Sequence, residues 1–113
     1  MFKQGDICKV NLNPVIGHEQ GNYRPVLVVN RDDIPLPGGL QIVIPITSKK
    51  HGFALEFELP QGMDTTGYVL PFQIRTLDLK RRDARFIEHA PEDFVEKCCS
   101  IVGQLFEIGG ARC

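Results

Sequence analysis

One glycine-bounded loop of this chain gathers three side chains that could bind and transform a charged substrate. The segment Gly17-His18-Glu19-Gln20-Gly21-Asn22-Tyr23-Arg24 holds an imidazole, a carboxylate and a guanidinium. Its last residue opens the apolar run Pro25-Val26-Leu27-Val28-Val29, which predicts a buried strand. Ionisable groups at the rim of a rigid strand are typical of catalytic sites and of polyanion-binding sites.

A phosphodiester such as that of RNA is one charged substrate on which groups of these types could act without a metal. A base takes the proton of the ribose 2′-hydroxyl, a cation or donor stabilises the charged phosphorane, and an acid protonates the leaving 5′-oxygen. Arg24 is the first candidate, because a guanidinium stays charged and can hold two phosphate oxygens at once. The alternative role for Arg24 is a surface ion pair with Glu19 or Asp6.

Two further residues could share the catalytic work with the arginine. Thr47 ends an apolar run, and its hydroxyl could donate to a phosphate oxygen; a Thr-Ser pair that turns the chain is the alternative. His18 could act as acid or base, since an imidazole titrates near about pH 6.5. A purely positional role for this loop histidine is equally compatible with the sequence.

A basic segment follows Thr47 and could bind the RNA that flanks the cut. Lysine side chains there would contact phosphates, and aromatic rings could stack on bases. Phe53 also alternates with Leu55 and Phe57, a pattern that is more typical of core residues. Glu19 could instead fix Arg24 or cap loop amides. The predicted RNA-binding residues are Glu19, Gln20, Ser48, Lys49, Lys50, His51 and Phe53.

The elements that must position these residues are short strands and one helix. Apolar patterning, interrupted by Pro and Gly, predicts strands over 5–12, 24–30, 41–47, 53–59, 67–73 and 75–79. Pro91, followed by Glu92 and Asp93, predicts a helix start, and Gly109-Gly110 its end. This order predicts one domain over residues 1–113, a mainly antiparallel SH3-like barrel with a C-terminal helix.

Composition limits the range of functions. The net charge is −1, so no global basic field draws the molecule to nucleic acid, and RNA binding must depend on a local patch. None of the four cysteines has C-x-x-C spacing, so we expect reduced thiols and neither a metal nor a cofactor. With no signal segment and no membrane-length apolar run, we expect a soluble, cytoplasmic protein.

Four blocks in order resemble the MazF/PemK (Kid) family: Gly5-Asp6-Ile7, Asn13-Pro14, Arg24-Pro25 and Pro45-Ile46-Thr47-Ser48. Members are ribosome-independent endoribonucleases of bacterial toxin–antitoxin pairs. The resemblance implies a barrel like that of the gyrase poison CcdB, sequence-selective cleavage of single-stranded mRNA, a homodimer and an acidic, partly disordered antitoxin. Family positions fall on Arg24 and Thr47, and a histidine of the Kid branch falls on His18.

One departure from the family pattern keeps other functions open. Where the Kid branch carries an Arg-x-Asp pair, this chain has Leu70 and Phe72, which cannot transfer protons. Nearby Arg75 and Asp78 are expected to pair with each other. A gyrase poison related to CcdB, although Trp is absent here, and a non-catalytic barrel that binds RNA or a partner remain the alternatives.

Overall fold

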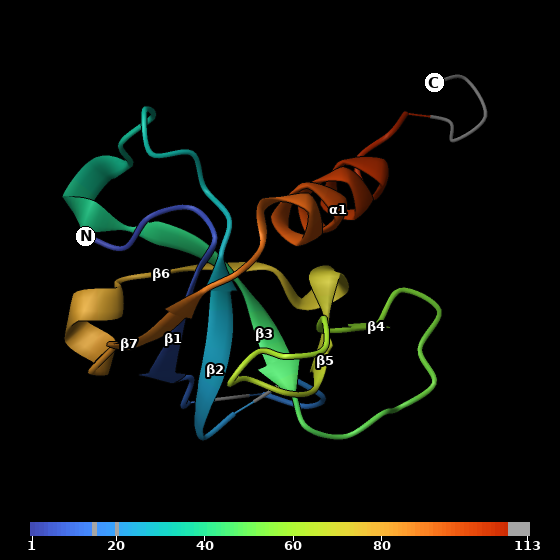
Figure 1. Cartoon of the computed structure of the whole chain (residues 1–113). Coiled ribbons are helices and arrows are strands. Elements are labelled where there is room, and N and C mark those ends of the chain that lie inside the picture. The colour runs from blue at the N-terminus through green and yellow to red at the C-terminus, as the bar shows by residue number, and fades with distance from the viewer. Residues whose placement is uncertain (15, 20, 109–113) are drawn as a thin grey trace.

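Seven strands form one sheet in which every pairing is antiparallel, and a single α-helix follows the last strand (Figure 1). The computed structural model describes residues 1–14, 16–19 and 21–108. The strand order is β4-β5-β3-β2-β1-β7, and β6 also pairs with β3. The elements are β1 Asp6–Asn11, β2 Tyr23–Val28, β3 Gln41–Thr47, β4 Phe57–Glu58, β5 Tyr68–Val69, β6 Arg75–Leu77, β7 Arg85–His89 and α1 Glu92–Gln104.

The central strands β2 and β3 are apolar on both faces, and each face belongs to a separate core. Alternate side chains of a strand point to opposite faces. Leu27 and Ile44 join the cluster that packs under α1, where Phe94, Val95 and Cys98 are buried. Val26, Val28 and Val43 join the second cluster, together with residues of β1, β6 and the turn after β6. We call the sheet surface that carries this second cluster the inner face.

The sheet curves into a barrel because β3 has different neighbours along its length. On one edge β3 pairs with β2; on the other, its first half pairs with β6 and its last two residues pair with β5. Strand β1 in turn pairs with β2 and with β7. The predicted fold class, a mainly antiparallel small barrel with a C-terminal helix, is confirmed.

Helix α1 starts where the sequence predicts, directly after Pro91, with Glu92 and Asp93 in its first turn. These two acids lie at the positive end of the helix dipole. The helix ends at Gln104, and the glycines that were predicted to end it, at 109 and 110, lie outside the described residues. No helix in the described ranges is both long and apolar enough to span a membrane.

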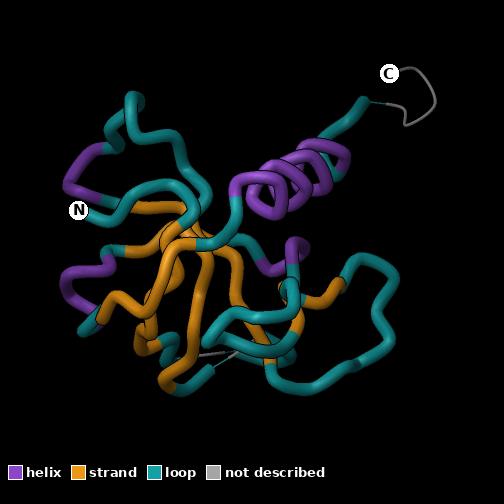
Figure 2. The backbone as a smooth tube through the Cα atoms, in the orientation of Figure 1, coloured by secondary structure: helices purple, strands orange, loops and turns teal. Residues whose placement is uncertain are grey.

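One predicted strand is mostly loop, and one observed strand was not predicted. The run 53–59 forms a strand only at Phe57–Glu58; the rest is an outer loop that Figure 2 draws in teal. The loop forms because the Glu56 carboxylate turns back to accept hydrogen bonds from the amides of residues 51–53. Strand β7, Arg85–His89, was not predicted, because its sequence Arg-Phe-Ile-Glu-His lacks both a clean alternation and a continuous apolar run.

The fifth predicted strand, 67–73, is also shorter than its pattern indicates. It is strand only at Tyr68–Val69, and Pro71 then opens a 3-10 turn over Pro71–Gln73. Proline fixes its own φ and has no N–H for a sheet, so the chain leaves the ladder there. Strand β6 begins shortly beyond this turn, and Arg75 lies opposite Val43 of β3.

The described cysteines, Cys8, Cys98 and Cys99, are free thiols, and Cys113 lies outside the described residues. Burial raises the pKa of Cys8 to about 12, with a smaller contribution from the negative charge of Asp6. Burial likewise raises the pKa of Cys98 to about 12, helped by the neighbouring Cys99. Cys8 and Cys98 are therefore packing residues with little thiolate character.

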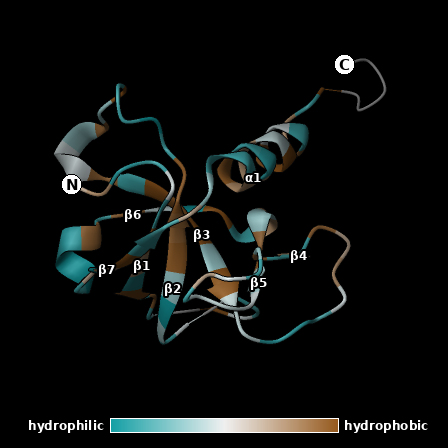
Figure 3. Ribbon diagram, viewed as in Figure 1, coloured by the Kyte–Doolittle hydropathy of each residue, from teal (hydrophilic) through white to brown (hydrophobic). Residues whose placement is uncertain are grey.

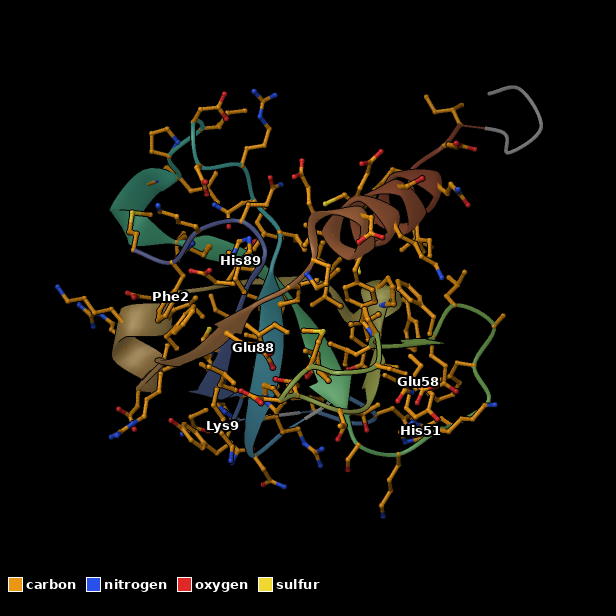
Figure 4. All side chains as sticks on the ribbon, viewed as in Figure 1. Phe2, Lys9, His51, Glu58, Glu88 and His89 are labelled. Atoms are coloured by element: carbon orange, nitrogen blue, oxygen red, sulfur yellow. The ribbon has the colours of Figure 1, made fainter. Side chains whose placement is uncertain are left out.

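A carboxylate on β7 holds the loop that leads into β5. Glu88 accepts hydrogen bonds from the amide of Asp64 at 3.2 Å and from both the amide and the hydroxyl of Thr65 at 2.6 Å (Figure 4). Burial raises the pKa of the Glu88 carboxyl, but these hydrogen bonds outweigh it and hold the pKa below its ordinary value of 4.5. The last strand thus fixes the segment that pairs with the end of β3.

We expect Glu88→Gln to lower the free energy of unfolding by about 1–2 kcal/mol at pH 7. The stabilisation from a lowered carboxyl pKa is present above the ordinary value and is lost as pH falls through the folded-state value. The difference between variant and wild type should therefore shrink below about pH 4.5, which urea unfolding at several pH values would measure. Glu96→Gln, at an exposed helix position, is the control; an equal loss there would contradict the role of Glu88.

Candidate active site

The loop between β1 and β2 folds across the end of β3 and creates a small polar cleft. The side-chain amide of Gln73 donates to the carbonyl oxygen of His18 at 3.3 Å, which joins this loop to the turn after β5. The cleft between them has a volume of about 190 Å³. Its lining residues come from the loop, from β3 and from the turn: Glu19, Pro45, Phe72, Gln73, Ile74 and Arg75.

Strands β2 and β3 bring Arg24 and Thr47 to the same edge of the sheet. Their ladder pairs Val26 with Pro45, and continuing the same register by two residues places Arg24 opposite Thr47. Both residues share the inner face, because each lies an even number of positions from a strand partner in the inner-face cluster, Val28 or Val43. Pro45, which lines the cleft, also belongs to this face.

Arg24 is half-buried and held by the backbone rather than by a carboxylate. Its Nε donates to the carbonyl oxygen of Gly21 at 2.7 Å. Within residues 1–14, 16–19 and 21–108, no acid lies within ion-pair distance of it. The two acids that the sequence offered are engaged elsewhere: Asp6 contacts His89 Nδ1 at 2.9 Å, and Glu19 caps the amide of Ile16. The guanidinium charge is therefore not neutralised by any described carboxylate.

Thr47 is buried, with 2% of its surface exposed, and closes a turn. Its Oγ1 accepts a hydrogen bond from the amide of Lys49 at 3.3 Å, the geometry of a hydroxyl that turns the chain. The hydroxyl proton is not used by that bond, so Thr47 can still donate. On the other side Thr47 pairs with Tyr68 of β5.

His18 and Glu19 are exposed on the loop. The His18 backbone, rather than its ring, makes the contact with Gln73. Glu19 lines the cleft and its Oε1 accepts from the amide of Ile16 at 2.9 Å, so its carboxylate also orders the loop. The structure therefore places Glu19 in the cleft lining and joins the His18 backbone to the turn after β5, while the His18 side chain is not part of that lining.

The basic segment after Thr47 is exposed and leads into the outer loop. Ser48, Lys49 and Lys50 are all at the surface. His51 stacks on Phe53 with ring centroids 5.1 Å apart and an interplanar angle of 6°. Phe53 is 46% exposed, so it does not belong to the core as its alternation indicated. Gln20, also predicted to bind RNA, lies outside the described residues.

Sequence reasoning missed two residues of the cleft, Phe72 and Arg75. The expected pair between Arg75 and Asp78 is wrong: Asp78 instead contacts Arg81 at 3.3 Å, and Arg75 Nη1 donates to the carbonyl oxygen of Leu12 at 3.5 Å. Arg75 opposes Val43 on β3 and therefore shares the inner face with Arg24. The position of Arg75 shortly after a proline turn was the available sequence signal. Only the pairing of β6 with β3 shows on which face of the sheet its side chain lies.

Within the described ranges, no three histidine, cysteine or carboxylate side chains gather closely enough to hold a metal ion. Two groups that could act on a substrate line the cleft, the Glu19 carboxylate and the Arg75 guanidinium. Arg24, Thr47 and His18 are not among its lining residues; they would add a second guanidinium, a hydroxyl and an imidazole. Such a set can bind a phosphodiester, stabilise added negative charge and transfer protons.

Fold and site together define a small antiparallel barrel in which one loop crosses the end of β3 beside a cleft lined by one carboxylate, Glu19, and one guanidinium, Arg75. Proteins of one known family match nearly the whole chain. A family model described as PemK-like, MazF-like toxin of type II toxin-antitoxin system matches residues 3–106. The chain belongs to this family, as its four sequence blocks indicate.

Individual relatives agree with that assignment. A protein of Escherichia coli named Endoribonuclease PemK is 35% identical over 112 residues, which cover 95% of this chain and 81% of that protein. The crystal structure of MazF (Form-I) from Deinococcus radiodurans has a TM-score of 0.85 and 32% identity, covering 94% of this chain and 96% of that one. MazE–MazF (Form-II) from the same organism has a TM-score of 0.77 and 33% identity, covering 91% and 93%.

Proposed function

We propose that this protein is a toxin endoribonuclease that cleaves single-stranded mRNA sequence-selectively, without a metal ion or cofactor, and that a cognate antitoxin neutralises it. The observation that supports the proposal is the β2–β3 register, which pairs Val26 with the cleft residue Pro45 and, if continued by two residues, sets Arg24 opposite Thr47. Membership of a toxin family and a relative named as an endoribonuclease support the same activity.

In this proposal the reaction begins with attack of the ribose 2′-hydroxyl on the adjacent phosphorus. Arg24, whose charge no described carboxylate neutralises, holds two phosphate oxygens and stabilises the phosphorane. Thr47 donates its hydroxyl proton to a phosphate oxygen. His18 either takes the proton of the 2′-hydroxyl as base or gives a proton to the leaving 5′-oxygen as acid, and solvent water makes the other of these two transfers. The 5′-oxygen leaves, and the products are a cyclic phosphate and a 5′-hydroxyl end.

The residues where the Kid branch carries an Arg-x-Asp pair take no part in this chemistry. Leu70 is fully buried in the core, and Phe72 is an exposed ring at the rim of the cleft. Proton transfer therefore falls to groups on the loop between β1 and β2. Ser48, Lys49 and Lys50 are proposed to bind phosphates that flank the cut, because they are exposed and directly follow Thr47.

The partners follow from the same reasoning. The exposed Lys49 and Lys50 and the Arg24 guanidinium would attract an acidic segment, so we propose an acidic, partly disordered antitoxin that covers them. We also propose that the toxin is a homodimer and that it acts in the cytoplasm, where mRNA is present. MazE–MazF of Deinococcus radiodurans, whose toxin chain shares this fold, is the structural precedent for a partner.

The decisive experiment incubates purified protein with a mixed-sequence RNA in EDTA and maps the fragment ends. We expect a limited set of cleavage sites, each leaving a 5′-hydroxyl and a cyclic phosphate. Intact RNA together with stalled DNA gyrase would contradict the proposal and would show that the protein is a gyrase poison. RNA that is bound but never cut would show that the protein is a non-catalytic RNA-binding barrel.

We expect Thr47→Val to lower the cleavage rate about 10²-fold, the usual effect of losing one donor to a transition state. Affinity for an RNA that carries a 2′-deoxy nucleotide at the cleavage position should change little, because the valine fills the same buried space. Thr76→Val, at an exposed position of β6, is the control. An equal loss of rate and affinity would show that Thr47 only shapes the turn.

A further inference from the structure

Two phenylalanine rings and a histidine ring lie in contact at the rim of the cleft, and each of them is partly exposed to solvent. His51 stacks parallel on Phe53, and Phe53 meets Phe72 edge to face with centroids 5.3 Å apart and an interplanar angle of 86°. Phe53 is 46% exposed and Phe72 is 39% exposed. We call these three residues the ring platform.

The platform is continuous with the proposed RNA cleft. Phe72 lines that cleft beside Arg75, while His51 directly follows the exposed Lys49 and Lys50. Figure 3 shows hydrophobic colouring on the outer loop between β3 and β4, beyond a polar stretch of chain. Apolar rings flanked by cations match a nucleotide, which offers a flat base and a charged phosphate at neighbouring positions.

A buried carboxylate fixes the loop that carries two of the rings. Glu56, whose side chain is 3% exposed, accepts hydrogen bonds from the amides of His51, at 2.9 Å and 3.1 Å, and of Phe53, at 3.0 Å; Gly52 donates to it as well. Burial raises the pKa of Glu56, but these amides outweigh it and lower the pKa overall. The rings are thus held in place before any ligand arrives, which reduces the entropy lost on binding.

We infer that the ring platform is a nucleobase-binding subsite that stacks a base of the substrate RNA next to the cleaved phosphodiester, with Phe72 as its main contact and Glu56 as a positioning residue. The inference rests on the proposed endoribonuclease function and adds the place where one base is held. Two half-exposed rings match the size of a base and are too few for a stable protein interface. Lysines beside them favour a polyanion over a second copy of this chain.

The test uses an RNA cut by the wild type, resynthesised with a 2′-deoxy nucleotide at the cleavage position so that it binds without being cleaved. We expect Phe72→Leu to weaken binding of this RNA about five- to a hundred-fold, the range for losing one stacked base. Phe86→Leu is the matched control, because Phe86 is a 58% exposed ring on β7. Equal affinity of both variants and the wild type would overturn the platform.

A second variant reports stacking itself. The chain has no tryptophan, so Phe72→Trp introduces a single fluorophore into the platform. We expect this variant to retain wild-type affinity and its fluorescence to be quenched when the RNA binds. Tight binding without any fluorescence change would show that the bases lie elsewhere and would overturn the inference.

A third comparison isolates the loop. Glu56→Gln removes the charge that holds the amides of residues 51–53, whereas Glu58→Gln changes an exposed carboxylate two residues away. We expect the first change to weaken RNA binding several-fold and the second to leave it unchanged. Protein stability should be similar in both, since the loop lies outside the core; equal affinities of the two variants would contradict the positioning role.

The outcomes separate this inference from the function on which it rests. RNA cleavage by the wild type with unaltered binding by Phe72→Leu would overturn the platform and leave the endoribonuclease standing. Neither cleavage nor binding by the wild type would overturn both. A shift from dimer to monomer in sedimentation of Phe72→Leu would show that a second copy covers the rings, and this result too would overturn the inference.

Discussion

Replacing Arg24 by alanine is expected to lower the rate of RNA cleavage about 10³-fold or more, since a cation that stabilises transition-state charge contributes effects of this order. The guanidinium is half-buried at the start of β2 and is held by the Gly21 carbonyl oxygen, so it is already oriented before substrate binds. The measurement is the rate at which full-length mixed-sequence RNA disappears in EDTA, together with a map of the 5′ and 3′ ends of the fragments.

Arg31→Ala is the control for this experiment. Arg31 lies beyond the opposite end of β2 and pairs with Asp33 on an exposed loop, so its loss removes the same charge from the whole molecule without touching the cleft. We expect wild-type cleavage from it. Full activity of Arg24→Ala, or equal losses in both variants, would remove Arg24 from the mechanism. Equal thermal unfolding of the two variants would show that the fold is not the cause.

Gly67→Ala should be the most destabilising single methyl addition in this chain, with a cost of about 3 kcal/mol or more in free energy of unfolding. Gly67 has φ +128°, a backbone region that other residues rarely adopt. A Cβ there would lie 2.3 Å from the carbonyl oxygen of Thr47, which is backbone and cannot rotate away. Relief requires β5 to move from the end of β3, so cleavage should fall together with stability.

Gly62→Ala separates the cost of the positive φ from the cost of the steric clash. Gly62 also has a positive φ, +88°, but a Cβ there would meet nothing within 4 Å. We expect it to cost about 1–2 kcal/mol, the conformational term alone. Urea unfolding of both variants measures the difference, and RNA cleavage should survive in Gly62→Ala. If the two variants were equally stable, the close approach of Gly67 to Thr47 would not be a constraint on the site.

The fold was predictable where local pattern and tertiary role agree. The runs 24–30 and 41–47 are apolar on both faces because β2 and β3 have a core on each side, and their strands lie where expected. The run 53–59 alternates as a strand should, yet Glu56 gives its backbone amides a better partner than a neighbouring strand. Strand β7 is recognisable only by its partner β1, far away in the sequence.

In the candidate site, too, local sequence motifs were predictable and contacts between distant segments were not. Arg24, Thr47 and His18 stand in local motifs, so sequence alone nominates them, and their catalytic roles remain predictions. The cleft, whose lining does not include these three residues, is built by contacts between distant segments, such as the hydrogen bond from Gln73 to His18. Phe72 illustrates the limit of sequence reasoning. From its residue type we inferred only that it cannot transfer a proton, whereas the structure shows that it contacts Phe53 and belongs to the ring platform. The family resemblance itself is confirmed.

The pairing of β1 with β7 joins the first and last strands of the sheet, residues 6–9 with residues 85–89. A ribosome-bound fragment that already contains Arg24 and Thr47 still has an open flank on β1, and it lacks the carboxylate that anchors Thr65. The barrel, and with it the rigid cleft, can be completed only after residue 89 has left the exit tunnel. Assembly of this nuclease is therefore a late event in its own synthesis, and until then β1 is an exposed edge available for wrong pairing.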